Sequence, residues 1–180
     1  IYGSVELEQV NISGEQANYF QRLAGHLIFN SEALRAKQDT LKRNKKQQSV
    51  LWSYSISGDV PILVYHIEDT KYIRQVGELL KAHAFWRQRG LKVDLVFMND
   101  HPPSYIDELQ EAIHQQIQSS TERHAYRKQG GVFVLRSDEL SADDSALIDT
   151  VAHVVLRGKL PNVNAINGST EIVPPAEHLY

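Results

Sequence analysis

Three short runs of apolar residues lie in the middle of the chain, at positions 60–67, 93–98 and 131–135. Each run is apolar along nearly its whole length, whereas a half-exposed strand alternates apolar with polar positions. Continuous apolar runs rich in β-branched residues are typical of strands that are buried on both faces of a parallel sheet. The pattern therefore predicts three parallel strands.

The segments that follow these runs have helical spacing. Apolar residues recur there every three or four positions, which predicts a helix with one buried face after each strand. The three stripes are Ile73, Val76, Leu80 and Ala84, then Ile106, Leu109, Ile113 and Ile117, and finally Leu147, Val151, Val154 and Val155. Residues 60–158 are thus predicted to form a small α/β domain with the order β-α-β-α-β-α and right-handed crossovers.

The flanking segments differ from this rhythm. Residues 1–14 alternate weakly and are predicted to be an extended lead-in. Residues 15–59 are predicted to hold one or two helices and a basic loop, with apolar residues repeating along 15–29 and a polar stretch at 37–49. Residues 159–180 contain three prolines and no periodicity, which indicates an irregular linker or arm. We expect the small sheet to lean on the N-terminal helices or on a neighbouring domain.

Composition fits a folded protein and excludes several kinds of site. The 180 residues are 42% hydrophobic and 23% charged, with a net charge of −3, which is ordinary for a globular protein. No cysteine is present, so disulfides, thiolate zinc sites and cysteine nucleophiles are excluded. No stretch approaches the roughly 18 apolar residues of a membrane span. The basic stretch 37–46 lacks aromatic residues, which indicates a solvated face and no nucleic-acid partner.

Polar residues follow each predicted strand, where ligands of open parallel sheets bind. The groups contain His66 and Asp69, then Asp100, then Arg136 and Asp138. One hypothesis is a small independent enzyme with Asp69, Asp100 and Asp138 as its carboxylates. The alternative, which we favour, is that these residues cap helices and turns, as Asp, Asn and Ser do after any strand.

Aromatic residues before the first strand suggest a second hypothesis, a carbohydrate-binding module. Its glucan groove would be lined by Trp52, Tyr54, Asp59 and His66. A similar surface could involve Trp86 with His83. The alternative, which we favour, is that these aromatic side chains are core or interface residues, because they bury large areas.

Sequence motifs for cofactors are missing. The pair Gly130-Gly131 precedes its strand, whereas phosphate-binding glycines follow a strand and open a helix. These two glycines therefore indicate a turn. No HExxH zinc motif and no nucleophile elbow occurs. We expect no metal site and no cofactor.

Several segments together resemble one family, the cyclic β-1,2-glucan synthases. They are YFQRLAGHLIF at 19–29, LW at 51–52 with ISGDVPI at 56–62, LKAHAFW at 80–86, GLKVDLV at 90–96 and GGVFVLR at 130–136. They occur in the order found in the family and span residues 15–160. The chain departs from the family at Ser55, where Gly is expected.

The resemblance implies a place in a very large bacterial inner-membrane protein. Such synthases join a glycosyltransferase, a cyclising transglycosylase and a region similar to glycoside phosphorylases. This chain is similar to the segment between two β-sandwich modules of that last region. The implied partners are the neighbouring domains and β-1,2-glucan. The segment itself would be soluble at the cytoplasmic face, without membrane contact.

The resemblance carries little catalytic machinery. The family's Asp-x-Asp and Gln-x-x-Arg-Trp transferase motifs are not present. Asp59 is a weak candidate for a catalytic aspartate of the phosphorylase barrel; the alternative is a turn residue. Because the chain begins with Ile1 and not with Met, we interpret it as a piece of a longer protein; the alternative is a processed protein. We therefore expect a non-catalytic α/β connector within a glucan-synthesising enzyme.

Overall fold

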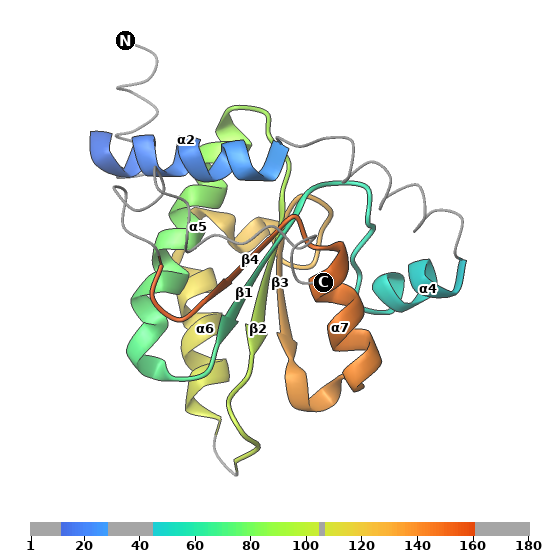
Figure 1. Cartoon of the computed structure of the whole chain (residues 1–180). Helices are drawn as coiled ribbons and strands as arrows, with labels where there is room; N and C mark the ends of the chain where they lie inside the picture. The colour runs from blue at the N-terminus through green and yellow to red at the C-terminus, as the bar shows by residue number, and fades with distance from the viewer. Residues whose placement is uncertain (1–11, 29–44, 105–106, 161–180) are drawn as a thin grey trace.

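The computed structural model describes residues 12–28, 45–104 and 107–160, which form a parallel sheet with helices on both faces (Figure 1). The strands are β1 (Ile62–Ile67), β2 (Asp94–Asn99), β3 (Val132–Arg136) and β4 (Val154–Arg157). They lie in the order β3-β2-β1-β4, and all three pairings are parallel. The α/β class and the parallel sheet are confirmed, and the three predicted strands form at the expected positions.

The fourth strand corrects the prediction of a three-stranded sheet. We predicted that Val154 and Val155 continue the third helix, but α7 (Ala142–Val151) ends before them. The backbone N–H of His153 donates to the Ile62 carbonyl at 2.7 Å, and β4 then pairs with β1. A short apolar run fits a buried strand as well as a helix. Pairing with the edge of β1 favours a strand over a helix for these residues, because it satisfies their backbone hydrogen-bonding groups.

Successive residues along each strand belong to cores on opposite faces of the sheet. Leu63 of β1 belongs to the core that contains α5 (Ile73–Gln88) and α6 (Glu108–Ser119). Val64 belongs to the core that contains Ile148 of α7. Figure 1 shows the same division, with α5 and α6 on one side of the sheet and α7 on the other. The sheet is therefore buried on both faces, as its apolar strands require.

Two helices precede the sheet in the described chain. The buried face of α2 (Gly14–Ile28) consists of Tyr19, Phe20, Leu23 and Leu27, and the helix lies across α5 (Figure 1). The indole N–H of Trp86 donates to the Phe20 carbonyl at 2.8 Å, which ties α5 to α2. α4 (Lys45–Ser53) lies on the side of α7, where Leu51 is fully buried. The N-terminal helices thus support the sheet from both sides.

Short 3-10 turns connect the larger elements: η1 (Thr70–Tyr72), η2 (Thr121–Ala125) and η3 (Ser137–Glu139). Residues Gly130 and Gly131 form the predicted turn before β3. Gly130 has a φ of +71°, and a Cβ on Gly131 would lie 1.9 Å from the Ala125 carbonyl oxygen. Ser55 has a φ of +70°. That conformation favours glycine, which agrees with the glycine expected there from the family resemblance.

Several sequence predictions lie outside the described residues. These concern the lead-in up to residue 11, most of the basic stretch 37–46 and the arm from residue 161 onward. Within the described part of the chain, no helix combines the length and apolar character needed to cross a membrane.

Candidate functional site

His66 is the centre of a charged cluster at the carboxyl end of the sheet. It lies near the end of β1 and is 6% exposed. Its Nδ1 is 2.7 Å from Oδ2 of Asp100, and its Nε2 is 2.8 Å from Oδ1 of Asp149 in α7. Carboxylate oxygens accept hydrogen bonds, so this geometry suits a ring that donates from both nitrogens, which is the imidazolium form. The cluster therefore joins β1, the end of β2 and α7.

The balance of forces at His66 favours the charged ring. Burial lowers the pKa of the imidazole, but hydrogen bonds to Asp100 and Asp149 outweigh it, and the pKa is raised above its ordinary value. Arg157 of β4 approaches the same carboxylates, with Nη2 3.6 Å from Asp149 and Nη1 4.0 Å from Asp100. Two cations thus face two anions. An imidazolium whose N–H groups are both engaged holds elements together and has no lone pair to act as a general base.

Asp138 and Asp69, the other two strand-end carboxylates, have separate roles. Asp138 pairs with Arg136, whose Nη2 lies 3.1 Å from Asp138 Oδ2, while Nη1 of the same guanidinium lies 2.8 Å from Asp107. The hydrogen bond from Arg136 lowers the pKa of Asp138. Asp69 accepts from the Lys71 backbone N–H at 2.9 Å and so caps η1. The contacts of Asp69, Asp100 and Asp138 therefore do not converge on one site.

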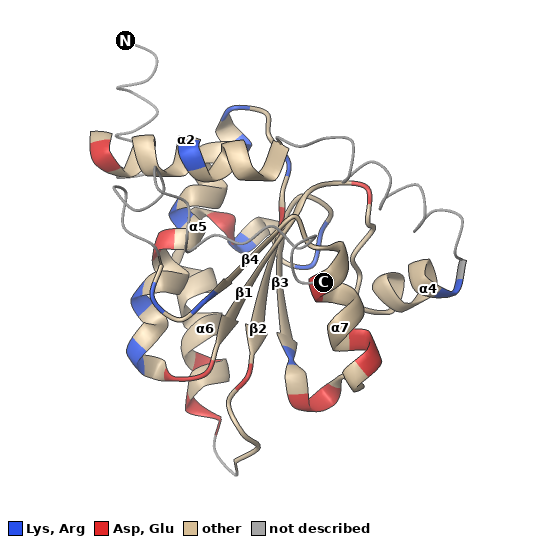
Figure 2. Ribbon diagram, viewed as in Figure 1, with Lys and Arg blue, Asp and Glu red and all other residues tan. Residues whose placement is uncertain are grey.

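Acidic residues surround this end of the molecule. Figure 2 shows them at the end of β2, at the start of α6 and in the loop that leads into α7. The described residues include no group of three or more His, Asp or Glu side chains arranged to hold a metal ion. Ion pairs with Arg136 and Arg157 neutralise part of this negative charge.

The four residues of the predicted glucan groove lie at different places. Trp52 is 57% exposed at the end of α4, and Tyr54 is half-buried with its hydroxyl donating to Asp144 Oδ2 at 2.8 Å. Asp59 is exposed, and its backbone N–H donates to Ser57 Oγ at 3.2 Å. His66 lies at the far end of β1 from Asp59.

A pocket of about 140 Å³ lies where the loop after α4 meets β3. It is lined by Ser53, Tyr54, Tyr126, Arg127, Phe133, Val134 and Leu135. Of the predicted groove residues, it includes Tyr54.

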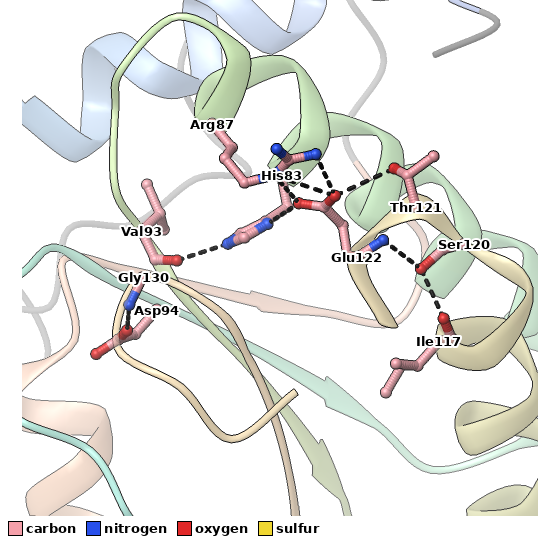
Figure 3. Close-up of polar contacts among 9 residues, drawn as sticks. All are labelled: His83, Arg87, Val93, Asp94, Ile117, Ser120, Thr121, Glu122 and Gly130. Carbon is pink, nitrogen blue, oxygen red and sulfur yellow. Dashed lines mark hydrogen bonds and ion pairs between the residues drawn. The ribbon is translucent and has the colours of Figure 1, made fainter. Parts of the chain in front are cut away.

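A buried polar network joins α5, η2 and the segment before β2 (Figure 3). The side chains of His83 and Glu122 are 1% and 0% exposed, and His83 Nδ1 lies 2.5 Å from Glu122 Oε1. His83 Nε2 lies 2.7 Å from the Val93 carbonyl oxygen. Burial raises the pKa of Glu122, but hydrogen bonds from His83 and Arg87 outweigh it and hold the pKa at about 2. His83 and its neighbour Trp86 are thus core residues.

Asp94 is a second buried carboxylate of this region (Figure 3). Its Oδ1 accepts from the Gly130 backbone N–H at 2.7 Å, whereas its Oδ2 is buried and has no hydrogen-bond partner among the described residues. Burial is the main cause that raises the pKa of Asp94 to about 6. The side chain fixes the Gly130 turn against the start of β2.

Sequence reasoning missed five members of these clusters: Arg87, Asp94, Glu122, Asp149 and Arg157. The sequence pattern predicts one helix that contains Asp149 and Arg157 and ends before Gly158. That prediction gives no reason to place either side chain near His66. Recognising β4 would have placed Arg157 at the carboxyl edge, since it pairs with His66 in the strand register. Glu122 lies in a polar segment that gives no sign of its burial.

Part of this chain has a characterised relative. Over 109 residues it is 36% identical to the cyclic β-(1,2)-glucan synthase NdvB of Rhizobium meliloti (strain 1021). The chain is related to a glucan synthase. The match covers 61% of this chain but 4% of the synthase, so it concerns a small part of a much longer protein. No protein-family model matches the chain.

Proposed function

We propose that this chain is a non-catalytic α/β connector within a β-1,2-glucan-synthesising enzyme. The observation that carries the proposal is the 36% identity over 109 residues to a segment that makes up 4% of a cyclic β-(1,2)-glucan synthase. Identity at this level over 61% of the chain supports a common fold and a common place in the larger protein. The connector would hold neighbouring modules of the same polypeptide in position.

The arrangement of charged side chains supports a structural role. His66 is engaged by two carboxylates, Arg136 pairs with Asp107 and Asp138, and Asp69 caps η1. A general acid or base must be within reach of a substrate proton, and a nucleophile needs an adjacent base. These side chains instead satisfy one another, which is typical of groups that fix loops and helix ends.

A chimera of the Rhizobium meliloti synthase tests the proposal. The matched segment of the synthase is replaced by the corresponding residues of this chain, and cyclic glucan synthesis is measured in membranes. We expect the chimera to retain synthesis. A matched variant carries Asp69→Asn, Asp100→Asn and Asp138→Asn. It should also synthesise glucan, because a connector supplies no catalytic carboxylate.

Two results would contradict the connector role. One is a folded chimera with normal abundance that makes no glucan. The other is turnover by the purified chain alone, measured as glucosyl transfer, hydrolysis or phosphorolysis of β-1,2-glucan. A core variant of the chimera, Leu95→Asp, serves as the control for loss through misfolding, since Leu95 is fully buried in β2.

A further inference from the structure

The pocket between α4 and β3 has the features of a small ligand site. We infer that it binds one glucose residue of a β-linked glucan chain. The inference rests on the proposed function, because the relation to a glucan synthase makes glucan the ligand. It deepens that function by assigning the connector a contact with the polymer. The pocket is formed by residues of the loops and of the edge strand β3. These residues are separate from the charged clusters at the carboxyl end of the sheet.

The lining of the pocket suits a sugar ring. Three aromatic residues line it: Phe133 is buried, and Tyr54 and Tyr126 are half-buried. Aromatic faces pack against the C–H groups of a pyranose, while a few polar atoms receive its hydroxyls. The volume of about 140 Å³ is below the roughly 300–1,000 Å³ of drug-sized sites. It therefore suits one hexose residue and leaves the rest of a chain outside.

Polar groups without strong internal partners line the same pocket. Among the described residues, Arg127 pairs with no carboxylate, and its guanidinium makes one long hydrogen bond of 3.4 Å, to Ser55 Oγ. The phenol oxygen of Tyr126 makes no hydrogen bond within the described part of the chain. Its ring is held by an edge-on contact with His114, with ring centres 5.7 Å apart. These groups are donors and acceptors available to sugar hydroxyls.

The backbone around the pocket is held in an unfavourable conformation on both sides. Ser55 and Arg127 have φ values of +70° and +59°, which residues with a Cβ rarely adopt. The two loops run side by side, joined by the Arg127–Ser55 contact and by a hydrogen bond of 3.1 Å from Gln129 Nε2 to Ser57 Oγ. Backbone strain of this kind gathers at functional sites, where it fixes a geometry before the ligand arrives.

Trp52 presents an aromatic surface next to this site. It is one of two exposed large hydrophobic residues in the described chain, at 57% exposure. Its indole N–H donates to the Ser57 carbonyl at 3.3 Å, which anchors the ring to the loop that borders the pocket. An anchored, exposed indole is suited to stacking on the next glucose of a chain.

The test is an amide and indole chemical-shift titration of the labelled chain with linear β-1,2-linked gluco-oligosaccharides. We expect saturable shifts at Tyr126, Arg127, Val134 and the Trp52 indole. Arg127→Gly should weaken binding about tenfold, because it removes the guanidinium hydrogen bonds. Glycine adopts a positive φ without strain, so the fold is retained. Lys128→Ala, which removes an exposed neighbouring charge, should leave the affinity unchanged.

Four results would overturn the inference: absence of saturable shifts, equal weakening by Lys128→Ala, equal affinity for an α-1,4-linked oligosaccharide, or displacement of the glucan by inorganic phosphate. The last result would mark an anion site built on Arg127. If the chain does not bind glucan but the chimera still synthesises it, this inference is wrong and the proposed connector function is unaffected. Failure of the chimera removes the proposed connector function whatever the titration gives.

Discussion

His66 and His83 are each held between two hydrogen-bond acceptors, and this determines what these residues can do. His66 lies between two carboxylates, and His83 lies between Glu122 and the Val93 carbonyl. Because Glu122 is ionised above a pKa of about 2, it accepts from His83. Both rings therefore donate from both nitrogens. With both ring nitrogens in hydrogen bonds, the two side chains crosslink elements and do not act as proton acceptors.

Replacing His66 should weaken folding in a pH-dependent way. Folding raises the pKa of His66 above the unfolded value of about 6.5, so the folded state binds the proton more tightly. Its stabilisation is complete below about pH 6.5 and is lost as pH rises through the folded pKa. His66→Gln should cost about 1–3 kcal/mol at pH 6 and less at higher pH. Urea unfolding from pH 6 to pH 9 measures this, and a constant difference would contradict it.

Glu122 should show the opposite pH dependence. Its pKa is lowered to about 2 from an ordinary value of 4.5, so the stabilisation is present above pH 4.5 and is lost as pH falls toward 2. Glu122→Gln also leaves the charge of Arg87 without its counter-ion and changes the hydrogen bond with His83. We expect the unfolding free energy to fall by about 2–4 kcal/mol at pH 7. The difference between the variant and the original chain should become smaller at acid pH. Denaturant melts at pH 7 and pH 3 test it.

Glu139→Gln is the matched control for this variant, since Glu139 is 70% exposed. It should change the unfolding free energy by less than about 0.5 kcal/mol. A similar loss in both variants would mean that the buried network of Figure 3 contributes nothing specific.

At the scale of elements, β4 is the feature that hydrophobic periodicity assigned wrongly. Val154 and Val155 extend the apolar stripe of α7 in sequence, with Leu156 next to them, and a helix through the stripe would also have had one buried face. In the structure all three are buried in a strand that pairs with β1. The remaining edge of β1 selects the strand, because it offers backbone partners that a helix end would lack.

Leu156→Ala tests the placement of β4. The side chain is 2% exposed and belongs to the core with α5, so its truncation should cost about 2–5 kcal/mol. Lys159→Ala, at an exposed position just after the strand, should change stability by less than about 0.5 kcal/mol. Chemical denaturation measures both. Equal and small effects would contradict a buried β4.

At the scale of the whole molecule, the sheet and the N-terminal helices form connected cores. α2 shares its core with α5 and α6, and α4 shares a core with α7. Helices on both faces are what a sheet of apolar parallel strands requires. The α/β unit predicted over 60–158 therefore lies in contact with segments from residues 12–28 and 45–53.

Removing α2 should expose apolar surface and weaken the fold. A chain shortened to residues 45–180 leaves Phe85 and Trp86 without their contacts to Phe20. We expect increased binding of a hydrophobic dye and a less cooperative melt, because four buried residues of α2 are lost. The control is the full chain with Ile28→Ala, at a position that is 54% exposed. An unchanged melt of the shortened chain would show that the sheet folds without α2.

The sequence by itself determined the α/β class, the three central strands and the parallel sheet. Continuous apolar runs are compatible with few other folds, because a strand without polar positions must be covered on both faces. It also indicated that Gly130-Gly131 form a turn, and it supported the relation to glucan synthases. Local pattern and backbone chemistry are sufficient for the strands and the turn, because these depend on neighbouring residues, whereas the relation depends on the order of several segments along the chain.

Tertiary structure alone decided the rest. It placed β4 at the edge of β1, brought Asp149 and Arg157 to His66, and buried Glu122 beside His83. It also placed Tyr54 and Arg127 on the same pocket. The physical reason is that these residues are far apart in the chain. Their contacts depend on strand order and crossovers, which hydrophobic spacing along the sequence does not encode.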